Sequence, residues 1–253
     1  MATPSSPEAG SSAGGAAAPV NHLGRIFGAL FNPKATFAEI AARPSWVAPI
    51  LLLTLIGLGV STVLNQKMDW ESYIRQKAEQ NTRFAQLSEP QKQRALESQV
   101  KFAPVSAYVF GAIGAVIFAL ILSGIYLGAF NLFAGAGLRF GAVFGITSHA
   151  LIPTCLGSVL AIVVAMAKPK GELDPEHLLA SNLGAVLGSD APKWLVSLAT
   201  SIEFFWIWVM VLLAVGFSAA NPKKVSMGTA FGIVLGLWAA WLTVKVGWVA
   251  IFS

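Results

Sequence analysis

Five long apolar runs, separated by polar connections, set the pattern of this chain. None of the runs alternates as a membrane barrel strand does, and each comes close to or exceeds the roughly 20 residues that a helix needs to cross a bilayer core. Backbone amides in lipid must pair within their own segment, so runs of this kind should be helices. The pattern predicts five spans, at Trp46–Leu64, Pro104–Phe133, Phe140–Met166, Leu195–Phe217 and Met227–Phe252.

Two segments precede the first run. Residues 1–20 consist mostly of Ala, Gly, Ser and Pro, a composition that cannot bury a core and that predicts a disordered tail. Residues 21–45 form a juxtamembrane amphipathic segment, in which Asn32 and Pro33 separate two short helices. We expect the first of these to lie in the headgroup layer, the alternative being an ordinary linker. Its apolar face consists of Leu23, Ile26, Phe27, Leu30 and Phe31.

The connection at residues 65–103 predicts a helical loop outside the membrane. Its apolar residues keep a helical stripe, and Ser88 and Gln91 have the spacing of a capping box, so two extramembrane helices are expected. The connection from Lys168 to Lys193 predicts an interfacial helix that starts at Asp174 and Pro175, and a re-entrant segment is the alternative. The apolar side of that helix would hold Leu179, Leu183 and Val186.

Composition supports an integral membrane protein. Of 253 residues, 55% are hydrophobic and 11% charged, and the mean hydropathy is +0.67, whereas soluble domains carry about a quarter charged residues. The predicted fold is all-α, a polytopic bundle of five transmembrane helices over residues 46–253, and its expected partner is the lipid bilayer. Cys155 is the single cysteine, so no intramolecular disulfide can form. The basic residues lack the aromatic interleaving of a nucleic-acid patch, so no nucleic-acid partner is expected.

Charges in the short connections predict the orientation of the chain. With the N-terminus inside, the cytoplasmic segments hold six bases, whereas the outer connections hold ten bases accompanied by nine acids. The total count therefore opposes the count over short loops, on which the positive-inside rule depends most. Following the short loops, we predict a multi-pass membrane protein with a cytoplasmic N-terminus and an extracytoplasmic C-terminus. The cytoplasmic bases are Arg25, Lys34, Arg43, Arg139, Lys223 and Lys224.

Four polar residues fall inside the apolar runs: Asn131, His149, Glu203 and Lys245. Glu203 and Lys245 lie about 25 Å and 28 Å from the short turn that joins their two spans. Their matching heights predict an intramembrane pair. Two alternatives are that each side chain snorkels separately to the outer interface, and that the two form a proton or ion relay.

Other candidate residues predict structure rather than chemistry. Pro153 should kink the third span four residues after His149, which we expect to be hydrogen-bonded within the bundle. No metal-ligand spacing, nucleophile–base arrangement or nucleotide loop appears, so neither a cofactor nor an enzymatic activity is expected. Small residues four apart predict close helix packing, with self-association as a weaker reading. They are Gly228, Gly232 and Gly236, and Gly124 and Gly128.

Three stretches of the chain resemble Yip-domain proteins, the Ypt/Rab-interacting membrane family. They are "LFNPKATFAEIAARPSW" before the first span, "HALIP" within the third, and "SIEFFWIWVMVLLAVGF" in the fourth. The likeness covers about residues 28 to 252. It implies five spans, a cytoplasmic N-terminus and a recurring acidic position at Glu203. Eukaryotic members are implicated in vesicle traffic and bind prenylated Rab proteins and each other.

This chain departs from those eukaryotic members. It lacks their acidic-Leu-Tyr-Gly-Pro stretch, and its first outer loop is far longer, so Rab-type GTPase binding is doubtful and a bacterial-type member is expected. Two functions follow as hypotheses. The first is a non-enzymatic scaffold that binds other membrane proteins or organises lipid. The second is a small-solute or ion transporter or channel subunit, which is less favoured because five spans cannot divide into two equal repeats.

Overall fold

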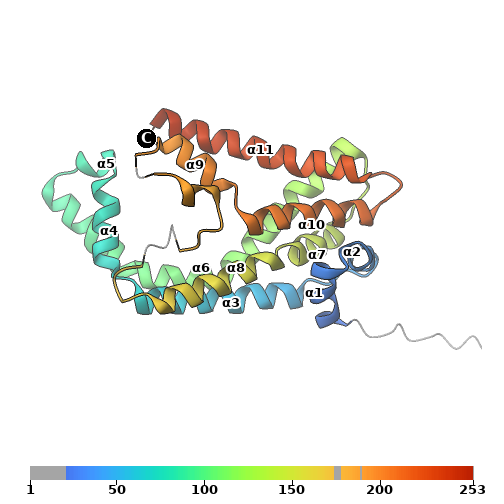
Figure 1. Cartoon of the computed structure of the whole chain (residues 1–253), viewed down its shortest axis with the longest axis horizontal. Coiled ribbons are helices and arrows are strands. Elements are labelled where there is room, and N and C mark those ends of the chain that lie inside the picture. The colour runs from blue at the N-terminus through green and yellow to red at the C-terminus, as the bar shows by residue number, and fades with distance from the viewer. Residues whose placement is uncertain (1–20, 174–177, 189, 253) are drawn as a thin grey trace, which may run out of the picture.

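The computed structural model describes residues 21–173, 178–188 and 190–252, and these residues form a bundle of helices. The predicted disordered tail, residues 1–20, lies outside the described residues. Among these described residues, four helical segments are long and apolar enough to cross a membrane, at Val47–Lys67, Glu89–Ala134, Phe140–Ala167 and Met227–Ile251, and a shorter apolar helix covers Phe204–Ala220. The all-α membrane fold is thus confirmed (Figure 1).

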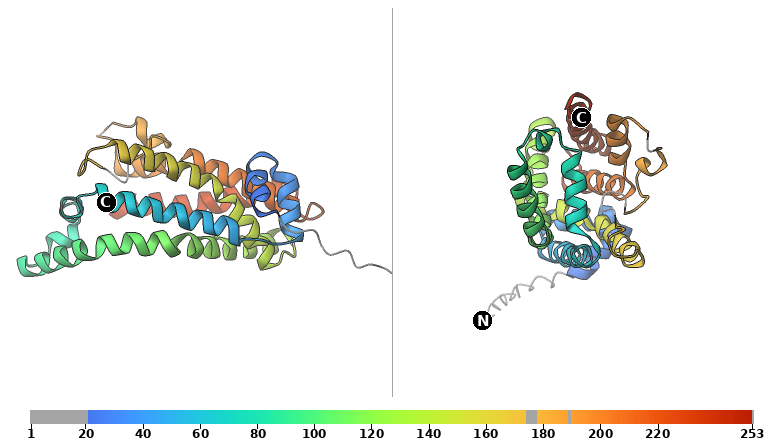
Figure 2. Two further views of the ribbon diagram at one scale, coloured as in Figure 1. Left: turned by 90° about the horizontal axis from the view of Figure 1, so that it is seen from below. Right: turned by 90° about the vertical axis from the view of Figure 1, so that its left-hand side faces the viewer.

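The bundle has two distinct ends (Figures 1 and 2). The hairpin end carries α1 (His22–Phe31), α2 (Pro33–Ala42) and the turn between α10 (Phe204–Ala220) and α11 (Met227–Phe252). The loop end carries α4 (Trp70–Glu79), α5 (Thr82–Ala85) and the C-terminal end of α11. Asn221 ties two turns of the hairpin end together, because its Nδ2 donates to the Ala136 carbonyl at 2.8 Å.

The two N-terminal helices are part of the packed bundle. Asn21 caps α1 by accepting from the Gly24 N–H, and Pro33 begins α2, as the sequence predicts. Phe37 and Ile40 of α2 are fully buried against the bundle. The predicted apolar face of α1 divides in two: Ile26 turns inward, while the exposed side chains are Leu23, Phe27 and Phe31.

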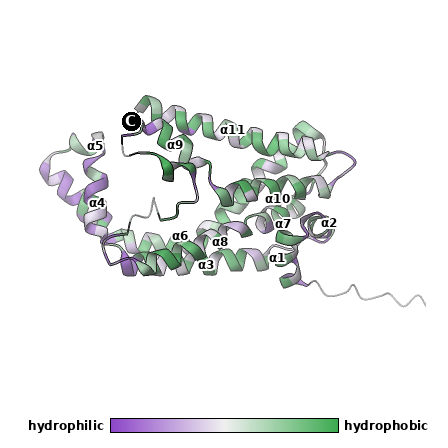
Figure 3. Cartoon of the chain, in the orientation of Figure 1, coloured by the Kyte–Doolittle hydropathy of each residue, from purple (hydrophilic) through white to green (hydrophobic). Residues whose placement is uncertain are grey.

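The second span is the end of a single 46-residue helix, α6 (Glu89–Ala134), about 69 Å long. The Ser88 N–H donates to Gln91 Oε1 at 3.0 Å, so the predicted capping box starts the helix. The second extramembrane helix is therefore continuous with the span, and Pro104, the predicted start, lies inside α6. The polar part of α6 projects beside α4 and α5 at the loop end (Figure 3).

The α3–α4 turn is the other boundary of this polar region. α3 (Val47–Lys67) ends at Met68, and Asp69 caps α4 by accepting from the Ser72 N–H and hydroxyl. The Ser72 hydroxyl, and then its N–H, lower the pKa of the Asp69 carboxyl below its usual value. Asp69 is thus a charged cap at the point where the chain leaves the apolar layer.

The third and fourth spans are both divided. α7 (Phe140–Ala150) and α8 (Ile152–Ala167) meet at Leu151, two residues before Pro153. The fourth run consists of α9 (Lys193–Ser201) and α10, with extended backbone at Ile202 and Glu203 between them. A continuous helix over Leu195–Phe217 was therefore the wrong expectation.

The connection before α9 also differs from the expected interfacial helix. Its predicted start, Asp174 and Pro175, lies outside the described residues. In the part that the structure describes, Leu179 is not helical, and only a short 3₁₀ turn, η1 (Leu183–Val186), follows. The reason is that residues 181–183 pair with the break in the fourth span.

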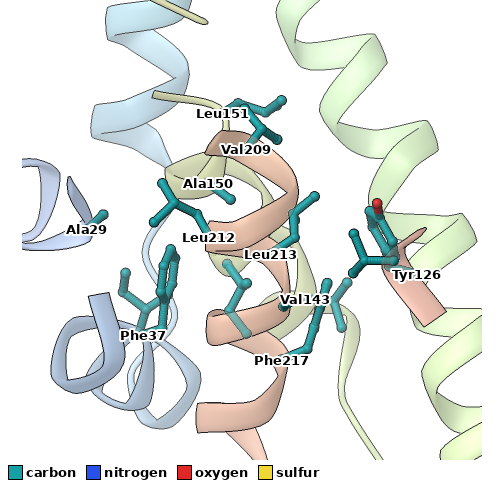
Figure 4. Close-up of a cluster of buried hydrophobic side chains, with 14 of the residues drawn as sticks. Ala29, Phe37, Tyr126, Val143, Ala150, Leu151, Val209, Leu212, Leu213 and Phe217 are labelled. Atoms are coloured by element: carbon teal, nitrogen blue, oxygen red, sulfur yellow. The ribbon is translucent and has the colours of Figure 1, made fainter. Parts of the chain in front are cut away.

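The apolar core lies toward the hairpin end, around α10 (Figure 4). Leu212, Leu213 and Phe217 project from α10 between α2, α6 and α7, and the Phe217 ring lies 4.3 Å from that of Phe130, centroid to centroid. Gly216 permits this approach, since a Cβ there would lie 2.5 Å from Ile146 Cγ2. The core fixes the C-terminal half of α10, near the hairpin end, and thereby holds the N-terminus of α10 toward the loop end of the bundle.

Candidate functional site

The break between α9 and α10 leaves backbone groups that a continuous helix would have paired. Two hydrogen bonds from residues 181–183 satisfy part of this need: Phe204 N–H donates to the Ser181 carbonyl at 2.9 Å, and Leu183 N–H to the Ile202 carbonyl at 3.2 Å. Asn182 and Glu203 thus form an isolated antiparallel bridge. Non-helical backbone at membrane depth is tolerated where protein surrounds it or where it lines a cavity.

Glu203 is the N-cap of α10. Its Oε2 accepts from the Trp206 N–H at 2.8 Å, and its backbone is extended, as N-caps require. The positive end of the α10 dipole also favours a carboxylate at this place. The charge in the apolar run therefore starts a helix, and no interaction with another side chain is needed to explain it.

Lys245 has different partners. Its Nζ donates to Ser201 Oγ at 2.7 Å and to the Ser197 carbonyl at 3.4 Å, and it lies 5.3 Å from the centroid of the Trp241 ring. These contacts place a cation at the C-terminus of α9, where the helix dipole is negative. The ion pairs among the described residues do not include Glu203 with Lys245. The break brings the two residues to one region, but in the structure each contacts its own helix end and they do not form a direct ion pair.

An open surface cavity of about 310 Å³ adjoins the break. Its walls come from α8, from residues 178–182 and from the first turn of α10. Gly157 permits the walls to meet, because a Cβ at this position would lie 2.8 Å from Phe205 Cδ2. The polar groups of the wall include both acceptors and donors, and they belong to Thr154, Ser158, Ser181, Asn182, Glu203 and Trp206.

Two acceptor oxygens beside the break are unused. Asn182 Oδ1 is buried and has no hydrogen-bond partner. The Glu203 carboxylate uses Oε2 for the cap, and none of the hydrogen bonds between described residues reaches Oε1. Glu203 lines the cavity and has an unused carboxylate oxygen, which makes this cavity the candidate ligand site, whereas Asn182 Oδ1 is sealed from it with less than 1 Å² of accessible surface.

The remaining membrane-embedded polar residues have local partners. His149 is 1% exposed, and its Nδ1 donates to the Gly145 carbonyl at 2.8 Å. Asn131 closes the connection between α6 and α7, since its Oδ1 accepts from the Leu138 N–H and its Nδ2 donates to the Leu138 carbonyl. Neither residue lines the cavity at the break.

The predicted packing glycines do not make the close contacts within this chain. A Cβ added at Gly124, Gly128, Gly232 or Gly236 would meet no atom within 4 Å, and at Gly228 it would meet only Ser226 Oγ, at 3.9 Å. The close approach instead joins α3 and α6, where a Cβ on Gly57 would lie 2.7 Å from the Gly111 carbonyl oxygen. Spacing alone could not distinguish the two sets, because each offers small residues on one helix face.

Sequence reasoning missed one buried network. Arg25 is 2% exposed; its Nη2 and Nε donate to Glu39 Oε1 at 2.7 and 3.1 Å, and its Nη1 donates to the Arg43 carbonyl and to Ser45 Oγ. This network joins α1, α2 and the start of α3. The available signal was Glu39, the lone acid that accompanies the bases predicted to be cytoplasmic after the tail.

A second surface lies at the loop end. A groove of about 650 Å³ separates α4 and α5 from the start of α6. Its wall mixes the ion pairs Arg75–Glu71 and Lys92–Glu89 with apolar side chains. The apolar members are Phe84, Leu96 and Val100, and the other polar members are Gln93, Glu97 and Lys101. Within the residues that the structure describes, no group of three or more His, Cys, Asp or Glu could hold a metal ion.

The chain is similar to known membrane proteins. The family model described as the Yip1 domain matches residues 27–249. The chain is also 20% identical over 210 residues to "Membrane protein YknW" of Bacillus subtilis (strain 168), which covers 83% of this chain and 84% of that protein. No solved structure matches the chain significantly.

Proposed function

The chain belongs to the Yip1 domain family of membrane proteins, and for this member we propose a non-enzymatic role in which it binds partner proteins and thereby organises the membrane around it. The observation that carries the proposal is the groove between α4, α5 and α6. Its lining of apolar side chains together with charges of both signs suits a protein segment, because protein interfaces combine apolar anchors with polar groups. Rab-type GTPases remain doubtful partners for the reasons that the sequence gives.

We also propose that the protein lies in a bacterial inner membrane, with the hairpin end in the cytoplasm. Short connections rich in Lys and Arg lie at that end, with Arg139 before α7 and Lys223 and Lys224 after α10. The groove would then face the extracytoplasmic side. Partners would be other membrane proteins with external segments, or a second copy of this chain.

Photo-crosslinking in the native membrane tests the proposal. A photoreactive residue at Gln93 lies in the groove, whereas one at Gln99 is exposed on the same helix and outside it. We expect Gln93 to yield a discrete adduct that Gln99 does not yield. Equal labelling from the two positions would contradict binding in the groove.

A small-solute or ion transporter or channel subunit is the second candidate, because the fourth span is broken beside a polar cavity, a feature of transporter helices. Reconstituted vesicles test it. Glu203→Gln should change proton or solute flux, while Glu172→Gln, an exposed carboxylate outside the cavity, should not. Flux equal to that of empty vesicles would exclude this function.

A further inference from the structure

One side of α1 is not covered by the rest of the described chain. Leu23, Phe27 and Phe31 recur every four residues and are 69%, 61% and 79% exposed, so they form one apolar ridge. The opposite side of α1 is fixed in place, because Arg25 and Ile26 are buried. α1 runs across the end of the bundle and not along its long axis (Figures 1 and 2). The ridge is therefore held at the surface of the hairpin end, parallel to the plane of a membrane that the spans cross.

Three connections of the chain meet at the same end. The Asn221 side chain, in the turn before α11, donates to the Ala136 carbonyl in the connection before α7. A Cβ on Gly141, in the first turn of α7, would lie 3.9 Å from Pro44 Cβ in the connection before α3. The polar residues of these three connections thus gather at the hairpin end.

The three connections and α2 present five basic side chains. Each is exposed, and the ion pairs among the described residues include none of the five. Residues 21–45, 134–141 and 220–227 contain one acid, Glu39, and its carboxylate is already bound by Arg25. The hairpin end therefore carries positive charge that these segments do not neutralise. The five bases are Lys34, Arg43, Arg139, Lys223 and Lys224.

The ridge and the bases together indicate what covers this end. The boundary of the acyl chains accepts an apolar ridge that lies in the plane of a membrane, and anionic headgroups attract the bases beside it. A zwitterionic leaflet would leave the five bases without a counter-charge. An acidic protein segment or a nucleic acid would neutralise the bases but leave the ridge in water.

We propose that the hairpin end binds an anionic phospholipid leaflet, with the ridge of α1 at the boundary of the acyl chains and the five bases on the phosphates of the headgroups. The leaflet is the one at the hairpin end, in either orientation of the chain. The inference goes beyond partner binding in the groove and does not rest on it.

Native mass spectrometry of the purified full-length protein tests the headgroup preference. Phosphatidylglycerol and phosphatidylcholine with identical acyl chains compete for the protein, and the bound lipid is counted. We expect a preference of about fivefold or more for phosphatidylglycerol, since one base near an anionic surface contributes about this factor. Lys223→Gln with Lys224→Gln should lower the preference. Arg83→Gln with Arg94→Gln, the same charge change at exposed positions of the loop end, should not.

An environment-sensitive fluorophore on Phe27→Cys, in a Cys155→Ser background, tests the ridge. In vesicles of phosphatidylcholine and phosphatidylglycerol in equal amounts, we expect blue-shifted emission that brominated acyl chains quench. The same fluorophore on Ser88→Cys, exposed at the loop end, is the control and should report water.

Two results would overturn the proposal. The first is equal retention of the two lipids by the unaltered protein, or double variants that behave alike. The second is a fluorophore at Phe27→Cys that remains in water, which together with a preference for phosphatidylglycerol would assign the bases to an acidic protein segment or a nucleic acid. Neither measurement depends on what binds in the groove.

Discussion

Single polar residues in this chain act by finishing helices and by joining them. Glu203 begins α10, Lys245 sits on the end of α9, Asn131 closes a turn, and Arg25 joins three N-terminal elements. The partners of Glu203, Lys245 and Asn131 are backbone groups or a hydroxyl, and Arg25 adds the Glu39 carboxylate to partners of this kind. Polar groups at membrane depth need a partner of some kind, and backbone freed by breaks and turns supplies it.

The two residues of the Arg25–Glu39 pair should respond differently to the loss of their partner. Glu39 is 56% exposed, so water solvates it when Arg25 is removed, whereas Arg25 is buried and loses its anion when Glu39 is removed. We expect Glu39→Gln to lower the free energy of unfolding by about 1–3 kcal/mol, and to have a much smaller effect in an Arg25→Met background. Thermal unfolding in detergent measures this cycle. The exposed Lys34→Met is the control, and additive effects of the two changes would contradict the pair.

A second double-mutant cycle distinguishes the hydrogen bond of Lys245 to Ser201 from a direct ion pair with Glu203. Lys245→Met and Ser201→Ala remove the two ends of one hydrogen bond, so we expect a coupling energy of about 0.5–2 kcal/mol between them. The coupling of Lys245→Met with Glu203→Gln should be smaller, because each side chain has another partner. If the second coupling exceeds the first in thermal unfolding, the direct ion pair exists after all.

Elements that depend on local sequence were predictable, and those that depend on distant pairing were not. The Asn21 cap, Pro33 at the start of α2 and the Ser88–Gln91 cap follow from neighbouring residues. The break at Ile202 and Glu203 does not, because it requires residues 181–183 to supply the missing backbone partners. For the site, the sequence drew attention to Glu203, but Asn182 and Ser158 meet it only through folding.

Glycine substitutions test the packing of the helices. Gly57→Ala should lower the free energy of unfolding by about 1–3 kcal/mol, because its Cβ would meet the Gly111 carbonyl. Gly232→Ala and Gly236→Ala meet open space and should be neutral or stabilising by up to about 1 kcal/mol. Thermal unfolding of purified protein in detergent compares them. A large loss of stability at Gly232 or Gly236 would instead indicate a contact with a second copy.

At the scale of the whole molecule, the two ends should lie on opposite sides of the membrane. Ser88 lies at the loop end and Ser226 in the turn before α11, and both are exposed. In a Cys155→Ser background, an impermeant thiol reagent should label Ser88→Cys in intact cells, and Ser226→Cys only after permeabilisation. Labelling of Ser226→Cys alone in intact cells would reverse the orientation.

The unbroken α6 connects the groove at the loop end mechanically to the membrane span. About 15 residues, or roughly 22 Å, precede Pro104, which has no N–H to give to the carbonyl of Val100, a residue of the groove wall. A force on the part of α6 before Pro104 should therefore bend the helix at Pro104. Asn65 of α3 holds this position in place, because its Nδ2 donates to the Pro104 carbonyl. Spin labels at Gln93 and Leu132 would measure the bend. Pro104→Ala should narrow the distribution of distances between the two labels, and an unchanged width would show that α6 is already rigid at Pro104.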